Sequence, residues 1–273
     1  MQIREYSLPI GWYPRNIEEI SRFLAEFPCS RPFSHAVIVP HAGWYYSGRL
    51  AALGISALKP DVDTVIVIGG HLPAGSRALF AMEDAVRTPF DPMLIDAELR
   101  GFLLKKLGGV EDRFRDNTVE VLLPMVRYYF PKAQLLWMRL PSDIESFEAG
   151  KVISEAAVNL NRKVNVITSN DLTHYGSNYG FAPKGRGEAA LRWVREVNDA
   201  GFIRAVETGN NEEVLKRAEI DHAACSAGAV LGVMGFAQAE GLPGAQLLKY
   251  ATSADVTGET SPDSFVGYAA MVF

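Results

Sequence analysis

The sequence predicts an α/β protein in which helices flank a mixed, mostly parallel central sheet. Short apolar, β-branched runs alternate with longer helical patterns, and this order is typical of parallel strands joined by crossover helices. The runs are almost continuously apolar, as expected for strands that are covered on both faces. Two strand-like segments close the chain and suggest that the sheet is mixed. No linker interrupts the pattern, so we expect residues 1–273 to form a single domain.

The expected strands are short and are bounded by turn residues. Four internal runs and two closing segments fit this description: Ala36–Pro40, Thr64–Gly70, Gln134–Leu140, Val164–Thr168, Gln246–Thr252 and Ser264–Phe273. The long loop Ala74–Pro92 contains Pro and Gly and is a candidate for lining a site.

Seven segments between and after these runs carry helical patterns: Leu50–Leu58, Asp96–Leu107, Thr118–Phe130, Ile144–Leu160, Glu188–Thr208, Asn211–Ala218 and Ala223–Glu240. Asn117, with Glu120 three residues later, resembles a capping box at the start of the third segment. The last segment is weakly polar but too short for a membrane span, so we expect a buried helix there.

The composition excludes several classes of protein. The chain has 27 basic and 32 acidic residues and a net charge of -5, which argues against nucleic-acid binding. Two cysteines cannot form a disulfide framework. The first residues lack the apolar core of a signal peptide. We therefore expect a cytoplasmic protein with no membrane association.

Three of the five histidines follow expected strands. His41 and His71 come directly after two of the apolar runs, and His174 follows a third, with Asp171 three residues before it. Ligands of α/β proteins bind at the carboxyl ends of strands, so these residues predict one site at one sheet edge. Each also has a structural interpretation: either histidine could support a turn, and Asp171 could cap the turn that follows it. An Asp-x-x-His spacing also allows the carboxylate to orient the imidazole.

Cys225 is expected to open the helix that starts near Ala223, where a helix N-terminus would favour the thiolate. Two histidines and a thiolate suit iron, copper or zinc. The same region also permits a nucleophilic triad of Cys225, His174 and Asp171. The spacing of the residues does not choose between a metal site and a triad.

Three segments together resemble the Memo family, whose prokaryotic members are called AmmeMemoRadiSam system protein B. They are Gly11–Pro14 (GWYP), Pro40–Gly48 (PHAGWYYSG) and Ser169–Gly176 (SNDLTHYG). The order of these motifs matches along nearly the whole chain.

The resemblance implies a fold similar to the class III extradiol dioxygenases, which are non-haem iron enzymes. It implies that His41 and His71 are metal ligands and that Cys225 replaces the third, carboxylate ligand. His174 would correspond to an acid/base histidine, with Asp171 beside it. Fe(II) is the first expected metal, with copper possible and zinc as a substitute. The chain departs from the family pattern at Leu72 and Asn117, where the family often has further histidines.

Three functions follow from these observations. The first is a redox enzyme in which Fe(II) or copper accepts oxygen and an organic substrate, with Trp12, Trp44 and Tyr46 as pocket walls. The second is a non-catalytic module that binds a small molecule or peptide, or works as a partner of radical-SAM system proteins. The third is a cysteine hydrolase, which would leave the first two histidines without a role. The sequence does not identify the substrate.

Overall fold

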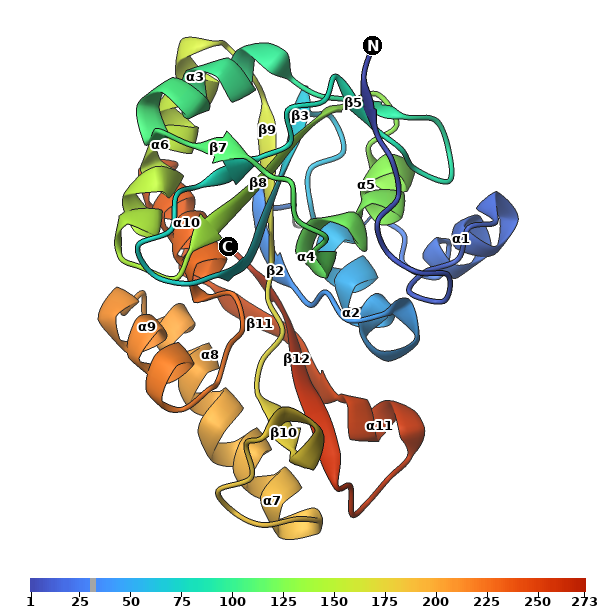
Figure 1. Ribbon diagram of the computed structural model, residues 1–273, viewed down its shortest axis with the longest axis vertical. Coiled ribbons are helices and arrows are strands. Elements are labelled where there is room, and N and C mark those ends of the chain that lie inside the picture. The colour runs from blue at the N-terminus through green and yellow to red at the C-terminus, as the bar shows by residue number, and fades with distance from the viewer. Residues whose placement is uncertain (30–32) are drawn as a thin grey trace.

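The computed structural model describes residues 1–29 and 33–273, and its described residues build a nine-stranded central sheet (Figure 1). The middle of the sheet consists of four parallel neighbours in the order β2 (Ala36–Val39), β9 (Val164–Ser169), β3 (Thr64–Leu72) and β8 (Gln134–Pro141). These are the four internal runs predicted as strands. Almost every residue in them is buried, because helices cover both faces.

Antiparallel strands extend the sheet at both edges, so the prediction of a mixed sheet is confirmed. On one side β12 (Ser264–Val272) pairs antiparallel with β2, β10 (His174–Gly176) and β11 (Gln246–Thr252). On the other side β4 (Leu79–Phe80) pairs antiparallel with β8, and β7 (Val110–Glu111) continues the edge. A separate small sheet joins β1 (Ile3–Arg4), β5 (Ala85–Val86) and β6 (Met93–Leu94).

Helices form two layers around the central strands. One layer contains α3 (Ala97–Leu107), α6 (Glu145–Asn159) and α10 (Ala227–Ala239), which bury the apolar side chains of one sheet face. The other contains α1 (Ile17–Leu24), α2 (Trp44–Ser56) and α5 (Leu123–Tyr129). In Figure 1, β12 extends beyond these layers to a lower lobe, where α7 (Glu188–Trp193), α8 (Ala200–Glu207), α9 (Asn211–Ile220) and α11 (Ser253–Thr257) lie near it.

The helix predicted at Thr118–Phe130 is broken in the structure. It forms the short α4 (Asn117–Glu120) and then α5, which has Pro124 in its first turn. The predicted capping box is wrong, because Asp116 caps α4 and accepts from the backbone N–H of Thr118. Glu120 instead faces the N-terminal segment.

Other boundaries differ in ways that bear on the site. α2 begins at Trp44, six residues before the predicted start, and α10 begins at Ala227, so Cys225 precedes the helix rather than opening it. The predicted helix Glu188–Thr208 contains a π-helical stretch, Val194–Asp199. Among the residues that the structure describes, no helix combines the length and apolarity needed to cross a membrane.

Candidate metal centre and adjoining cleft

His41, His71 and Cys225 come together at the carboxyl edge of the sheet. His41 follows β2, His71 is the penultimate residue of β3, and Cys225 lies in the segment between α9 and α10. One ligand atom from each residue lies within 4.8 Å of the corresponding atoms of the other two. Segments 30 and 154 residues apart in sequence meet here because parallel strands end at a common edge.

The buried ring of His41 is held in one orientation and one tautomer. Its Nδ1 lies 2.9 Å from Ser169 Oγ, and the Ser169 hydroxyl donates its proton to the carbonyl of Thr118. The hydroxyl therefore accepts from Nδ1–H, and Nε2 is the nitrogen that faces the cysteine. That Nε2 lies 3.3 Å from Cys225 Sγ.

His71 is fixed in a comparable way by a carboxylate. Its Nδ1 lies 2.9 Å from Asp116 Oδ2, and Asp116 also lies 3.5 Å from the buried guanidinium of Arg139. The backbone of His71 has φ 57°, an uncommon conformation for a residue with a side chain. Burial lowers the pKa of His71, but hydrogen bonds to Asp116 and Cys225 outweigh burial and raise it to about 10.

Cys225 faces both imidazoles. Burial alone would raise the pKa of its thiol, but the charges and hydrogen bonds of His41 and His71 lower it to about 6. The thiolate is therefore the main form at neutral pH. The backbone N–H of Asp171 donates to Sγ at 3.3 Å, and the N–H of Cys225 donates to the carbonyl of Asp171 at 3.1 Å. These two bonds attach the cysteine to the loop after β9.

Asp171 and His174 lie beside this cluster with separate contacts. Asp171 Oδ1 accepts from the backbone N–H of His41 at 2.8 Å, and its Oδ2 lies 3.9 Å from His41 Nε2. Burial raises the pKa of Asp171. His174 Nδ1 lies 3.1 Å from the carbonyl of Leu172, and its ring meets Tyr179 edge-on at 5.0 Å. Asp171 thus contacts His41 directly, and its influence on His174 is through charge.

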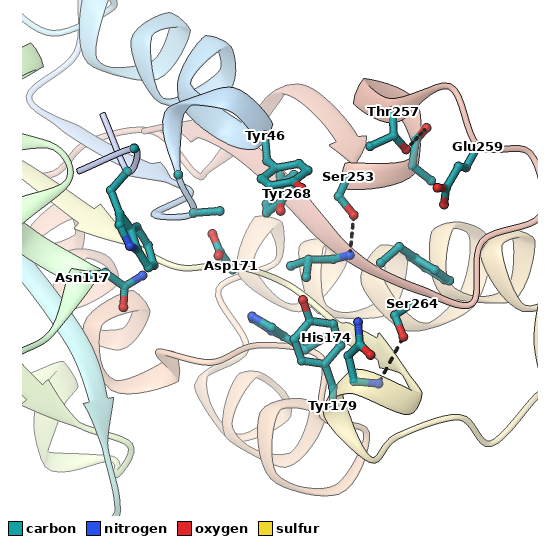
Figure 2. A pocket seen from close by; sticks show the side chains of 18 of the residues that line it. Tyr46, Asn117, Asp171, His174, Tyr179, Ser253, Thr257, Glu259, Ser264 and Tyr268 are labelled. Carbon is teal, nitrogen blue, oxygen red and sulfur yellow. Dashed lines mark hydrogen bonds between the residues drawn. The ribbon is translucent and has the colours of Figure 1, made fainter. Parts of the chain in front are cut away.

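A cleft of about 620 Å³ adjoins the cluster (Figure 2). Its walls come from the N-terminal segment, the start of α2, the loop after β9, and the β11–α11–β12 region, and include Trp12, Ala42, Tyr46, Asn117, Asp171, His174, Tyr179, Ser253, Glu259, Ser264 and Tyr268. Trp12 and Tyr46 therefore lie where the pocket was expected. Trp44 is not among the lining residues; its indole Nε1 donates to the carbonyl of Val121 at 2.8 Å in the core. The loop Ala74–Pro92 does not line this cleft either.

Several lining residues carry no sequence signal for this position. Tyr268 belongs to a strand whose sequence is typical of a buried core strand. Tyr179 and Glu259 lie in short segments that contain no recognisable motif. Asn117, a departure from the family pattern, contributes directly, because its Nδ2 donates to the carbonyl of His41 at 2.9 Å.

Glu120 anchors the wall that carries Trp12. Its buried carboxylate accepts from the backbone N–H of Ser7 at 2.8 Å, from that of Leu8 at 3.1 Å, and from the hydroxyl of Tyr13 at 2.9 Å. The residue expected to cap a helix therefore holds the N-terminal segment across the mouth of the site.

The fold and the site define an α/β protein with a His/His/Cys grouping at the carboxyl edge of its sheet and an aromatic cleft beside it. The profile of the Memo-like protein family matches residues 4–272. The chain belongs to this family, and the resemblance found in its motifs is confirmed.

Known relatives match over most of their length. A MEMO1 family protein of Pyrococcus abyssi is 33% identical over 94% of this chain and 92% of its own. Another from Methanopyrus kandleri is 31% identical over 90% and 84%. A solved structure of an uncharacterized Escherichia coli K12 protein superposes with a TM-score of 0.52 at 12% identity, covering 87% of this chain and 99% of that one. This likeness bears on the fold alone.

Proposed function

We propose that this chain is a mononuclear, non-haem metal protein and a redox enzyme of the oxygenase type. His41, His71 and Cys225 would hold Fe(II), with copper as the second choice and zinc as a substitute. The observation that carries the proposal is the convergence of three ligand atoms within 4.8 Å, beside a cleft whose lining includes Asn117 and Asp171, which both hydrogen-bond the backbone of His41.

The residues present fit a metal ion in three respects. Each imidazole uses Nδ1 for a hydrogen bond, to Ser169 or Asp116, so Nε2 is the nitrogen left to bind a metal, which would displace any proton there. Cys225 is a thiolate at neutral pH, as a ligand must be. The separation of 3.3 Å between Cys225 Sγ and His41 Nε2 is close to that of two ligands bound about 2.0 and 2.3 Å from one ion.

Three protein ligands would leave positions open for other molecules. A metal bound there supplies a redox-active Lewis acid to whatever occupies the cleft. The protein's own contribution would come from the cleft walls: His174, which lines the cleft, would move a proton at the substrate, and Asp171 fixes the backbone of His41. The Trp12 and Tyr46 side chains would position an organic substrate.

The geometry favours this proposal over a cysteine hydrolase. Within the described parts of the chain, Cys225 Sγ has hydrogen-bond partners in His41, His71, Asp171 and Ser226, and none in His174. A general base must lie within hydrogen-bond reach of its nucleophile. These contacts disfavour the triad of Cys225, His174 and Asp171.

Metal analysis after anaerobic purification tests the proposal. We expect about one metal ion per chain, and loss of at least tenfold in metal affinity in His41→Ala and in Cys225→Ser. Cys29→Ser is the matched control, because Cys29 is a free, exposed thiol remote from the site. Normal metal affinity in His41→Ala and Cys225→Ser would refute the metal centre.

Oxygen uptake then tests the redox role. The metal-loaded protein should consume oxygen in the presence of a reductant or substrate, and His174→Gln should slow that uptake while metal content stays normal. Uptake that is unchanged by His174→Gln would remove this residue from the chemistry.

A further inference from the structure

The cleft has no cationic side chain in its described lining. The ionisable groups that face it are the carboxyls of Asp171 and Glu259, the imidazole of His174 and the hydroxyls of tyrosines, without a lysine or an arginine. A pocket that takes an anion normally offers such a cation or free backbone N–H groups. The charge of this cleft therefore disfavours an anionic ligand.

The nearby helix N-terminus does not supply the missing donors. α2 begins at the cleft with Gly43 as its cap. The N–H groups of His41 and Ala42 before it are already bonded to Asp171, and the N–H of Trp44 donates to the carbonyl of Trp12 at 2.8 Å. These donors are used within the protein, so they do not form an anion site.

The walls of the cleft suit a flat ring. Trp12, Tyr46, Tyr179 and Tyr268 all line it, and Figure 2 shows Tyr46 and Tyr268 near Asp171 with Tyr179 beside His174. Aromatic side chains pack against rings and also attract cations through their π faces. Both properties favour a ligand that is aromatic and positively charged.

Glu259 indicates at which end of the cleft the positive charge of a ligand would lie. In Figure 2 it lies at the opposite end of the cleft from Asn117, which contacts His41. Its carboxylate is exposed and has no ion pair with any residue in the described ranges 1–29 and 33–273. Arg186 and Arg195, which contact the β11–β12 region, are paired with Asp263 and Asp255. The far end of the cleft is therefore a free anionic position.

We propose that the cleft binds a cationic aromatic amine, with its ring between Trp12, Tyr46 and Tyr179 and its ammonium group toward Glu259. The opposite end of such a ligand points to the His/His/Cys grouping. This inference rests on the proposed function in taking the cleft as the substrate side of that site.

Three probes of nearly equal shape test the charge preference: phenethylamine, 2-phenylethanol and 3-phenylpropanoate. Titrations followed by NMR at low salt give their dissociation constants for the full-length protein, as purified and after chelation of metal. We expect phenethylamine to bind at least fivefold more tightly than 3-phenylpropanoate in the chelated protein, with the neutral alcohol between them.

Substitutions at Glu259 test where the ammonium group lies. An exposed ion pair of this kind changes affinity by about two- to fivefold, so Glu259→Gln should weaken phenethylamine binding by that factor. Glu259→Lys should make 3-phenylpropanoate the better ligand. Glu219→Gln and Glu219→Lys are matched controls, because Glu219 is an exposed glutamate on α9 that does not line the cleft. These control substitutions alter the net charge equally and should leave the order of the three probes' affinities unchanged.

The outcomes separate this inference from the proposed function. Three results would overturn the proposed amine site. They are binding of 3-phenylpropanoate to the chelated protein as tight as or tighter than that of phenethylamine, no binding of any probe, and an order of affinities that Glu259→Lys does not change. The metal analysis of His41→Ala and Cys225→Ser decides the metal centre independently. A preference for phenethylamine in metal-free protein supports the cleft even if those variants bind metal normally.

Discussion

Asp199 is a buried carboxyl group, and no described residue forms an ion pair with it, so its pH dependence can be tested directly. It lies at the end of the π-helical stretch and is inaccessible to solvent. Thr173 donates to its Oδ1 through both N–H and hydroxyl, and Tyr250 donates to Oδ2 at 2.7 Å. Burial raises the pKa of Asp199 to about 7, because it outweighs these three hydrogen bonds. Since Thr173 precedes His174, the network also supports the cleft.

The sign of the pH dependence follows from this raised pKa. The folded protein retains the Asp199 proton up to about pH 7, whereas the unfolded chain releases it near the ordinary value of 3.8. The stabilisation is fully present below about pH 4 and is lost as pH rises through about 7. A difference of about three pKa units corresponds to about 4 kcal/mol in the free energy of unfolding.

Urea unfolding between pH 4.5 and 8.5 measures this effect in the wild type and in Asp199→Asn. The asparagine has nearly the same shape and stays neutral, and the Tyr250 hydroxyl can accept from its amide. The stability of the wild type relative to Asp199→Asn should fall by about 3–4 kcal/mol over this range. Asp61→Asn, at an exposed aspartate, should show no such trend. If the stability of the wild type relative to Asp199→Asn stays constant or grows with pH, Asp199 does not hold a proton in the folded protein up to about pH 7.

Two further predictions concern packing and the thiolate. Gly228→Ala should lower the free energy of unfolding by about 1–3 kcal/mol in urea titrations, because a Cβ there would lie 1.7 Å from the carbonyl oxygen of Pro141. Gly101→Ala, with open space around it in a helix, should raise stability by about 0.5–1 kcal/mol, and equal effects of the two changes would contradict this account. In metal-free protein, the ultraviolet absorbance of thiolate should show Cys225 ionising near pH 6, while Cys29, which is exposed but partly desolvated by its neighbours, has a raised pKa and should ionise above its usual range. A Cys225→Ser variant that keeps the pH 6 transition would assign it to another group.

The central sheet was predictable because its strands are apolar on both faces. Such runs have one stable location, under helices on both sides, and all four were found within two residues of their predicted ends. Helix boundaries were less predictable, because contacts with the rest of the protein decide them. Pro124 divides one predicted helix, and Glu120 is used by the N-terminal segment rather than by a cap.

The site was only partly predictable. The positions of His41 and His71 after strands were enough to place them at one edge, since parallel strands end together. Cys225 was a candidate thiolate from its place near a helix start, and the family resemblance assigned it as the third ligand, although its spacing from the histidines gave no metal motif. Asp116 and Ser169, which fix the two imidazoles, carried no such signal, because their role depends on which loops pack beside each histidine.

The sequence by itself therefore determined the α/β architecture, the family, and the edge of the sheet at which chemistry-bearing residues gather. These properties follow from local apolar patterns and from short motifs. Only the tertiary structure decided the hydrogen-bond partners of each ligand, the ionised state of Cys225, and the walls and charge of the cleft. The physical reason is that those properties arise between segments far apart in the chain, where a distance of a few ångströms decides whether a carboxylate supports a histidine, holds the N-terminal segment or faces the cleft.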